Sequence, residues 1–421
     1  MCEVIKSTVV ALARHLWPNC KRPFMFEQLK PVPTDPILGL MTEYKADTNP
    51  KKVDLSVGVY KNESGDTPVM RAVKKAEQQR LETETTKSYL GLAGDVQFND
   101  LMTSLVFGDH DAVKAGRIKT AQTPGGTGSL RVAAEFIKRS NPNATIWVTN
   151  PTWANHFSIF GAAGLTTNEF PYFDFDTMGL KFEEMVASLN TIPEGDVVLL
   201  HACCHNPSGM DLTIEQWQIV ADIAKKQKFT FLIDSAYQGF GEGLDEDAAG
   251  VRLLASQLDE LLVSASCSKN FGLYRDRVGT FSVMTANAAQ ADIAYSVALN
   301  VIRAIYSMPP AHGAAVVANI LSTPELKALW EQELTEKRTR INGLRSFIVE
   351  KFKEHNVPGN FDFIAKQNGM FSFLGISKEA IQTLKDEYSI YIVGSSRINV
   401  AGVNDNNADY LAKALADVLS R

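Results

Sequence analysis

The segment of the sequence best suited to chemistry places one lysine among small hydroxyl residues. Lys269 follows Ser266 and Ser268, and Arg277 stands eight positions beyond the lysine. A lysine amine condenses with an aldehyde, while hydroxyls and a planar guanidinium together grip a doubly ionised phosphate. This combination indicates a place to hold pyridoxal phosphate, an aldehyde cofactor that carries a phosphate. The plain alternative for a Ser-Lys pair is a basic surface turn after a buried strand.

The elements around this segment alternate between short apolar runs and helical patterns from about residue 115 to 285. The apolar runs begin at Thr145, Asp196, Phe229, Leu261 and Thr280. Strands that are apolar on both faces and separated by helices predict an α/β fold with a mainly parallel sheet covered on both sides. Ligands of such sheets bind beyond the carboxyl ends of the strands, where polar clusters follow the runs here.

A glycine-rich turn precedes one of the helical patterns. Residues 124–129 read Pro-Gly-Gly-Thr-Gly-Ser and lead into an apolar stripe that continues to Ile137. Glycines before a helix let backbone N–H groups approach a phosphate, and the helix N-terminus favours the anion. The spacing fits neither a P-loop nor a dinucleotide fingerprint, so the turn alone is a weak signal.

Four residues near strand ends could surround an aromatic cofactor ring. Asp234 ends the mostly apolar five-residue run that begins at Phe229, where a carboxylate costs desolvation unless it meets a partner such as a pyridinium nitrogen. Tyr237 and Asn206 could hydrogen-bond the ring oxygen, and Trp153 offers a flat face. The alternatives are an aspartate that caps the next turn and a core tryptophan.

Two arginines stand in apolar or small surroundings. Arg303 and Arg397 could each bind a carboxylate, and structural ion pairs remain the alternative. A metal site is not expected at His201, Cys203, Cys204 and His205, because strand alternation points neighbouring side chains to opposite faces.

Composition excludes several classes of protein. The chain has 421 residues, 45% of them hydrophobic, with 42 basic and 48 acidic side chains and a net charge of −6. No basic stripe suits nucleic acid, and no apolar run approaches the roughly 20 residues of a membrane span. Five scattered cysteines indicate reduced thiols and an intracellular location.

The two ends of the chain differ in texture from its middle. Residues 1–24 alternate basic and apolar side chains, which is typical of either an organelle presequence or an N-terminal helix. A presequence would direct the protein to the mitochondrial matrix; otherwise we expect it in the cytoplasm. A long helical pattern from Pro324 to about Lys353 leads into short strands of a smaller α+β domain, with the boundary near residue 337.

Taken together, these segments resemble the aspartate aminotransferases, class I pyridoxal phosphate enzymes of fold type I, and in particular their bacterial-type branch. The resemblance runs from about Met25 to the C-terminus. Its motifs begin at Asp35, Val57, Tyr89, Gln122, Asn150, His205, Asp234, Ser268, Tyr306 and Arg397.

The resemblance implies a large cofactor-binding domain, residues 68–336, with a seven-stranded sheet. Residues 34–67 and 337–421 would form the small α+β domain, and residues 25–33 an arm on a partner. The protein would be a homodimer with shared active sites that transfers amino groups between L-aspartate and 2-oxoglutarate.

It also implies a role for each site residue, with Lys269 both condensing with the cofactor and moving the proton. The phosphate would be held by Gly126, Thr127, Ser266, Ser268, Arg277 and, from the other subunit, Tyr89. Asp234 would pair with the ring nitrogen, Tyr237 and Asn206 with the ring oxygen, and Trp153 would stack with His156 behind it. Arg397 would bind the α-carboxylate of the substrate, and the neighbouring subunit's Arg303 would bind its side-chain carboxylate. The other substrate contacts would be Gly58, Trp153 and Asn206.

Three positions depart from the common pattern of the family. Gly125 replaces a serine of many eukaryotic members, and Met308 and Ile305 replace polar residues near Arg303. An aromatic amino acid aminotransferase is therefore the nearest alternative. A nicotinamide-dependent oxidoreductase would leave Lys269 unexplained, and a catalytically silent relative would not need the full residue set.

Overall fold

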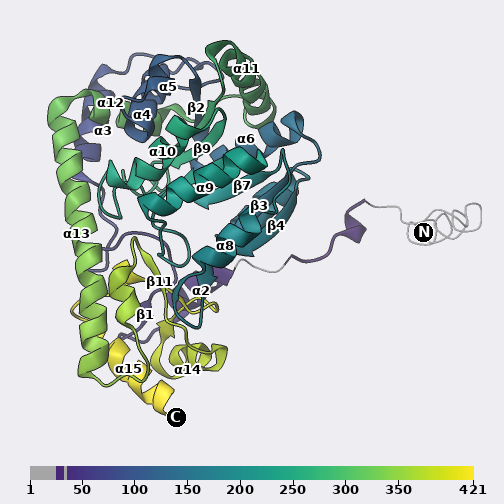
Figure 1. Ribbon diagram of the computed structural model, residues 1–421. Coiled ribbons are helices and arrows are strands. Elements are labelled where there is room, and N and C mark those ends of the chain that lie inside the picture. The colour runs from purple at the N-terminus through teal and green to yellow at the C-terminus, as the bar shows by residue number, and fades with distance from the viewer. Residues whose placement is uncertain (1–24, 33–35) are drawn as a thin grey trace, which may run out of the picture.

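The structure is a computed structural model that describes residues 25–32 and 36–421. The prediction for residues 1–24 lies outside this range, and so does the last residue of the expected arm, 25–33. The described part of the arm begins with a 3-10 helix, η1 (Met25–Gln28), drawn well away from the body in Figure 1. Its Met25, Phe26 and Leu29 side chains are exposed. An apolar arm in this position leaves its side chains available to another surface.

A seven-stranded sheet forms the centre of the molecule. Its strands lie in the order β2, β10, β9, β8, β7, β3, β4. Their bounds are β2 (Ile118–Pro124), β3 (Thr145–Asn150), β4 (Thr166–Pro171), β7 (Val197–His201), β8 (Thr230–Ser235), β9 (Leu261–Ser266) and β10 (Val278–Met284). Strand β10 is antiparallel to both of its neighbours, and the other pairs are parallel. The predicted α/β fold with a mainly parallel, seven-stranded sheet is confirmed.

Helices cover both faces of the sheet because its inner strands are apolar on both sides. In β7, Val197 and Leu199 belong to one core cluster, and Val198 and Leu200 belong to the other. This is the period of two that sends successive side chains of a strand to opposite faces. The cluster that contains Val197 and Leu199 packs under α6 (Gly125–Ser140), α7 (Asn155–Ala162) and α11 (Ala288–Ile305). The cluster that contains Val198 and Leu200 packs under α4 (Val96–Phe107), α9 (Ile214–Gln227) and α10 (Ala249–Gln257).

Residues 36–54 lie together with residues 355–421 below the sheet in Figure 1. Strand β1 (Val53–Asp54) pairs in parallel with β12 (Ile390–Tyr391), and β11 (Phe371–Phe373) pairs antiparallel with β13 (Arg397–Asn399). The surrounding helices are α2 (Pro36–Ala46), η3 (Asp362–Lys366), α14 (Lys378–Tyr388), η4 (Val400–Gly402) and α15 (Ala408–Ser420). The division of the chain at residues 67 and 337 stays a prediction.

Helix α13 (Pro324–Glu354) runs beside both the sheet and this lower group of elements (Figure 1). Its 31 residues span about 46 Å at 1.5 Å per residue. Pro324 opens it at a position where the missing N–H is not needed. Trp330, Ile341 and Phe352 are among the buried side chains along its length. One rigid helix therefore contributes to the packing of both parts of the molecule.

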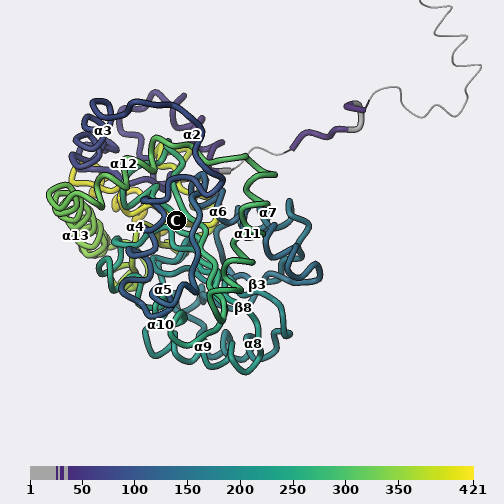
Figure 2. Tube along the Cα trace, turned by 90° about the horizontal axis from the view of Figure 1, so that it is seen from above, coloured from purple at the N-terminus to yellow at the C-terminus, as the bar shows by residue number. Residues whose placement is uncertain are grey.

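Two further helices pack on α13 at its N-terminal half. Figure 2 shows α3 (Arg71–Thr83), α12 (Ala311–Ser322) and α13 gathered on one side of the body, with α7 and α11 on the opposite side. The remaining elements are α5 (Asp111–Lys114), α8 (Phe182–Leu189), η2 (Glu246–Ala248) and the hairpin of β5 (Phe173–Asp174) with β6 (Gly179–Leu180). In the part of the chain that the structure describes, no helix is both long enough and apolar enough to cross a membrane.

Candidate active site

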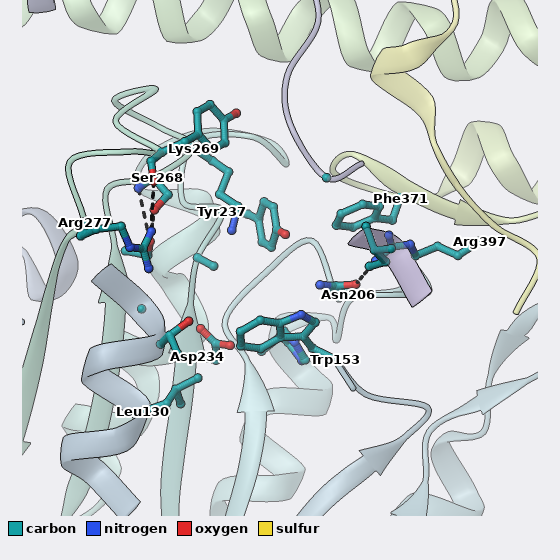
Figure 3. A pocket seen from close by; sticks show the side chains of 18 residues that line it. Leu130, Trp153, Asn206, Asp234, Tyr237, Ser268, Lys269, Arg277, Phe371 and Arg397 are labelled. Atoms are coloured by element: carbon teal, nitrogen blue, oxygen red, sulfur yellow. Dashed lines mark hydrogen bonds between the residues drawn. The ribbon is translucent and has the colours of Figure 1, made fainter. Parts of the chain in front are cut away.

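A cavity of about 270 Å³ lies at the carboxyl ends of β7, β8 and β9 (Figure 3). This volume is close to the lower end of the usual range for small-molecule sites, about 300 to 1,000 Å³. The sequence-predicted residues that line it are Gly58, Gly126, Thr127, Trp153, Asn206, Asp234, Tyr237, Ser266, Ser268, Lys269, Arg277 and Arg397. The fold thus brings these residues together from distant parts of the chain, at the sheet edge where α/β proteins bind ligands.

One end of the cavity is built to hold an anion. The N-terminus of α6 opens here, with no side-chain cap on its first N–H groups and no acidic residue in its first turn. Gly125 has a φ of +70°, and a Cβ at this position would come within 2.6 Å of Arg277 Nη2. The hydroxyls of Ser266 and Ser268 lie 3.2 Å apart beside them. Free backbone N–H groups, hydroxyls and a guanidinium together favour a phosphate.

Lys269 extends into the middle of the cavity from the loop between β9 and β10 (Figure 3). Its Nζ lies 4.6 Å from the centre of the Tyr237 ring. Burial lowers the pKa of Lys269 to about 8, an effect that Asp234 opposes and Arg277 reinforces. Because this pKa is closer to neutrality than that of an exposed lysine, more of the amine is uncharged and nucleophilic.

Asp234 provides a buried carboxylate at the end of β8. His156 Nε2 lies 3.2 Å from its Oδ2, and His156 Nδ1 lies 2.8 Å from Thr152 Oγ1. Burial alone would raise the pKa of Asp234, but the hydrogen bond to His156 and the charge of nearby Lys269 help to outweigh it, and the pKa is lowered. A carboxylate that stays ionised inside the protein suits a cationic ring nitrogen as partner.

His201, which sequence reasoning did not assign to the site, also lines the cavity. Among the described residues, neither of its ring nitrogens has a hydrogen-bond partner. Burial lowers the pKa of His201 to about 3, although Asp234 acts in the opposite direction. The uncharged ring therefore leaves polar atoms in the cavity wall without adding a positive charge beside Asp234.

The opposite end of the cavity carries a second cation, Arg397 (Figure 3). Its Nη1 donates to Asn206 Oδ1 at 3.3 Å, and its Nη2 donates to Ser56 O at 2.8 Å. The ring of Phe371 lies 4.4 Å from the guanidinium carbon. A Cβ on Gly58 would come within 2.7 Å of the Phe371 ring, so only glycine leaves this ring in place. A buried, oriented guanidinium at the end of the cavity opposite Arg277 suits a carboxylate.

Tyr237 stands between the two ends. Burial raises the pKa of its hydroxyl far above the ordinary value, with Asp234 adding to the effect and Arg397 opposing it. The hydroxyl therefore stays protonated and can donate a hydrogen bond within the cavity.

Two predicted site residues lie outside the cavity of this single chain. Tyr89 is 94% exposed and lines a separate hollow of about 900 Å³ together with Met308. Arg303, near the end of α11, is exposed, and its Nη1 donates to Ser307 Oγ. Ile305 in the same turn is 41% exposed. The family resemblance implies that both Tyr89 and Arg303 serve a neighbouring subunit, and that assignment stays a prediction.

The four residues considered for a metal do not form one cluster. His201 groups with His156 and Asp234, whereas Cys203 and Cys204 group with Asp247. The Asp247 carboxylate already accepts three backbone N–H groups, from residues 239, 241 and 242.

Several residues that line the cavity have no chemical signal in the sequence. These residues are Ile37, Leu130, Ala236, Tyr274 and Phe371. Each stands in an apolar or mixed run that is equally typical of a protein core, so only its position in the fold reveals it. For Phe371, the small residue that faces it, Gly58, is the one indirect sign.

The chemical groups that line the cavity are those needed to bind pyridoxal phosphate. One end of the cavity has the donors to hold a phosphate, the middle offers an amine of lowered pKa, and a buried carboxylate lies at the strand end. His201 leaves unpaired polar atoms in the wall, as expected where a polar group completes a site.

Comparison with known proteins gives consistent results. The family described as aminotransferase class I and II matches residues 50–415. An aspartate aminotransferase from Salmonella typhi is 49% identical over 94% of this chain and 100% of its own length. An aromatic-amino-acid aminotransferase from Paracoccus denitrificans is 47% identical over the same shares. The crystal structure of an aromatic-amino-acid aminotransferase from Burkholderia pseudomallei, covalently bound to pyridoxal phosphate, superimposes with a TM-score of 0.92 at 43% identity, covering 94% of this chain and 100% of the other.

Proposed function

Since this chain belongs to the class I and II aminotransferases, we propose that it transfers an amino group reversibly between L-aspartate and 2-oxoglutarate, giving oxaloacetate and L-glutamate. The chain is a pyridoxal-phosphate-dependent aminotransferase whose substrates are amino acids and oxo acids. The observation that carries the proposal is the buried guanidinium of Arg397 at the end of the cavity opposite Arg277. It would receive the α-carboxylate, and Arg303 would receive the side-chain carboxylate.

The residues around the cavity would divide the binding of the cofactor among them. The phosphate would be held by Gly126, Thr127, Ser266, Ser268 and Arg277, with Tyr89 of a second subunit. Bound pyridoxal phosphate supplies an aldehyde that takes up amino groups and a ring that withdraws electrons from the substrate Cα. Asp234 would keep the ring nitrogen protonated, and the hydroxyl of Tyr237 and the amide of Asn206 would bond the ring oxygen. Trp153 would cover one face of the ring.

Lys269 would then act as the proton carrier. With substrate and cofactor bound, the Lys269 amine would accept the proton from the substrate Cα as a general base and, once protonated, would give a proton back as a general acid. A pKa near 8 suits both steps close to neutral pH. The aromatic rings of Phe371 and Trp153 border the cavity and limit the access of water to the transferred proton.

A homodimer with shared sites would explain the two residues that lie away from the cavity. Tyr89 and Arg303 are exposed on one chain. A dicarboxylate substrate needs a second cation besides Arg397, and Arg303 of a second copy would supply it. The apolar side chains of the arm, Met25, Phe26 and Leu29, are exposed as well, which supports their contact with a second copy.

Hybrid dimers test the sharing directly. Lys269→Ala and Arg303→Ala homodimers are each prepared, mixed and allowed to exchange subunits. If Arg303 serves the partner's cavity, each hybrid contains one site with both residues intact. Random exchange makes about half of the dimers hybrids, so the aspartate activity of an equal mixture returns to about a quarter of the wild-type value. If each chain uses its own Arg303, every site in the mixture carries a substitution and no activity returns.

The reaction itself is tested on the purified holoenzyme. Addition of L-aspartate should bleach the visible absorption of the bound cofactor, and 2-oxoglutarate should restore it, because the amino group passes to and from the cofactor. Lys269→Ala should show no turnover, whereas replacement of the exposed Lys75 by alanine should leave turnover unchanged. A protein that takes up the cofactor but does not respond to aspartate contradicts the proposal.

A second candidate is an aromatic amino acid aminotransferase. The observation in its favour is apolar surface near Arg303, where Met308 lines the hollow beside Tyr89 and Ile305 is partly exposed. The 47% identical relative from Paracoccus denitrificans supports it as well. The ratio of kcat/KM for L-aspartate to that for L-phenylalanine separates the two, and a ratio below one would favour the aromatic function.

A further inference from the structure

Arg345 is a charged side chain held inside the protein, outside the lining of the cavity. It belongs to α13, and only 1% of its surface is exposed. Burial lowers the pKa of Arg345 to about 10, while Cys204 and Asp211 act in the opposite direction. Placing a guanidinium in the interior is costly unless its donors are satisfied, so its partners indicate what it does.

All the partners of Arg345 lie on one short segment. Its Nη1 donates to the carbonyl of Ile364 at 3.0 Å. Its Nη2 approaches three more carbonyls, those of Asn368 at 2.9 Å, Gly369 at 2.7 Å and Phe371 at 2.6 Å. We call residues 364–371 the carbonyl loop. Carbonyl oxygens gathered this closely repel one another unless a cation lies among them, so Arg345 determines the path of this loop.

The carbonyl loop leads directly to the substrate end of the cavity. Phe371 begins β11, which pairs with β13 so that Phe373 lies opposite Arg397. The Phe371 ring also packs against the guanidinium of Arg397. A displacement of the loop would therefore move both the strand beside Arg397 and the ring that covers it.

The same loop is tied to the turn that carries Asn206. The Asp211 carboxylate accepts the N–H groups of Cys204 at 2.8 Å and His205 at 2.9 Å, which fixes the chain just before Asn206. Asn368 joins the two segments, because its Nδ2 donates to Asp211 Oδ2 at 3.3 Å. Its backbone N–H also donates to the carbonyl of residue 209 at 2.8 Å. The carbonyl loop thus connects the support of Arg397 with the support of Asn206.

We propose that Arg345 is a positioning residue for the substrate end of the cavity. By holding the carbonyl loop, it sets Arg397 at the distance from Asn206 at which the two side chains form their hydrogen bond. The inference rests on the proposed function, in which Arg397 receives a substrate carboxylate. It concerns the binding of the substrate and leaves the phosphate end, at the opposite side of the cavity, unaffected.

The test compares substitutions at two arginines of the same helix. Arg345→Met removes all four hydrogen bonds, and Arg345→Lys keeps a cation that reaches fewer carbonyls. Arg340→Met is the matched control, because Arg340 donates to the carbonyl of Val403 at 3.4 Å, away from the carbonyl loop. Each holoenzyme is titrated with maleate, a dicarboxylate without an amino group, and binding is followed by the absorption of the bound cofactor. KM and kcat for aspartate and the Kd for pyridoxal phosphate are measured in parallel.

We expect Arg345→Met to raise the Kd for maleate and the KM for aspartate about tenfold or more, since a small misplacement of a binding group weakens the interaction strongly. Its kcat and its Kd for pyridoxal phosphate should stay within about threefold of wild type. Arg345→Lys should have a Kd for maleate and a KM for aspartate between those of the wild type and Arg345→Met. Arg340→Met should bind maleate as the wild type does.

Three results would overturn the inference. One is unchanged maleate binding in Arg345→Met, and another is an equal loss of affinity for maleate and for pyridoxal phosphate, which indicates a general structural role. If Arg345→Met does not fold, unchanged maleate binding in Arg345→Lys is the third. A wild-type enzyme that binds neither maleate nor aspartate instead refutes the proposed function, and the inference with it.

Discussion

The buried amine of Lys269 should destabilise the cofactor-free protein at neutral pH. Its pKa lies at about 8 instead of the ordinary 10.5, chiefly because burial disfavours the charged form. At about 1.4 kcal/mol for each tenfold change in the proton equilibrium, this difference corresponds to about 3 kcal/mol. Lys269→Met, which keeps an unbranched side chain one atom shorter and without charge, should therefore raise the free energy of unfolding of the apoprotein by about that amount at pH 7.

The effect should depend on pH in one direction only. Below pH 8, Lys269 is charged in the folded and unfolded chains, and the full cost of burying the charge is present. Between about pH 8 and 10.5 the unfolded chain binds more protons than the folded chain, so the wild-type free energy of unfolding rises with pH. Above that range the amine is neutral in both states. The advantage of Lys269→Met should accordingly shrink as the pH rises through this window.

Urea unfolding of the apoproteins at pH 7, 8, 9 and 10, at one fixed protein concentration, measures this difference. Replacement of the exposed Lys75 by methionine is the control, and it should change the free energy of unfolding by no more than about 0.5 kcal/mol at any pH. A methionine can add apolar packing of its own, but that contribution does not vary with pH. The reasoning is refuted if the advantage of Lys269→Met is the same at pH 7 and pH 10.

Three further substitutions have defined outcomes. Gly125→Ala places a Cβ 2.6 Å from Arg277 Nη2 at a φ of +70°, so fluorescence titration of the apoprotein should show at least tenfold weaker binding of pyridoxal phosphate; equal binding would contradict the anion site. Glu333→Gln removes one of the two carboxylate oxygens that accept the first N–H groups of α3, at 2.7 and 2.9 Å, and should cost about 1 to 3 kcal/mol in urea unfolding; an unchanged midpoint would show that water replaces it. Gly58→Ala places a Cβ 2.7 Å from the ring of Phe371, so steady-state assays should give a higher KM for aspartate with little change in the Kd for pyridoxal phosphate. The opposite pattern would place Gly58 at the phosphate end of the cavity and contradict its assignment to the substrate end.

The cofactor end of the site could be predicted from the sequence because its parts are close together or follow strands. Lys269 and its hydroxyl neighbours lie in one segment, and the rule that ligands bind at strand ends brings in Asp234 and Asn206. The long helix was also predictable, because Pro324 and a charged pattern mark it, and α13 begins at that residue.

The parts that could not be predicted depend on long-range packing. Phe371 stands in an apolar run that is typical of any core strand, and its place beside Arg397 depends on strand pairing. Arg345 lies in a helix rich in charges, where an arginine is normally exposed, and its partners are backbone carbonyls, which every residue type carries and which leave no mark in the sequence. Strands β2 and β4 were not among the predicted runs, because both are edge strands that contain several polar residues and lack the apolar run that indicates a buried strand.

The antiparallel strand β10 has a consequence for how the protein is made. It pairs with β2, whose residues 118–124 precede it by more than a hundred positions, and the Gly125 turn meets Arg277 only through this pairing. The cavity further requires Arg397, which lies close to the C-terminus. Because synthesis proceeds from the N-terminus, a growing chain has no complete binding site until translation is nearly finished. Cofactor loading should thus wait until β10 has been made, and chains that end before it should accumulate without colour, whereas substrate binding must also wait for Arg397.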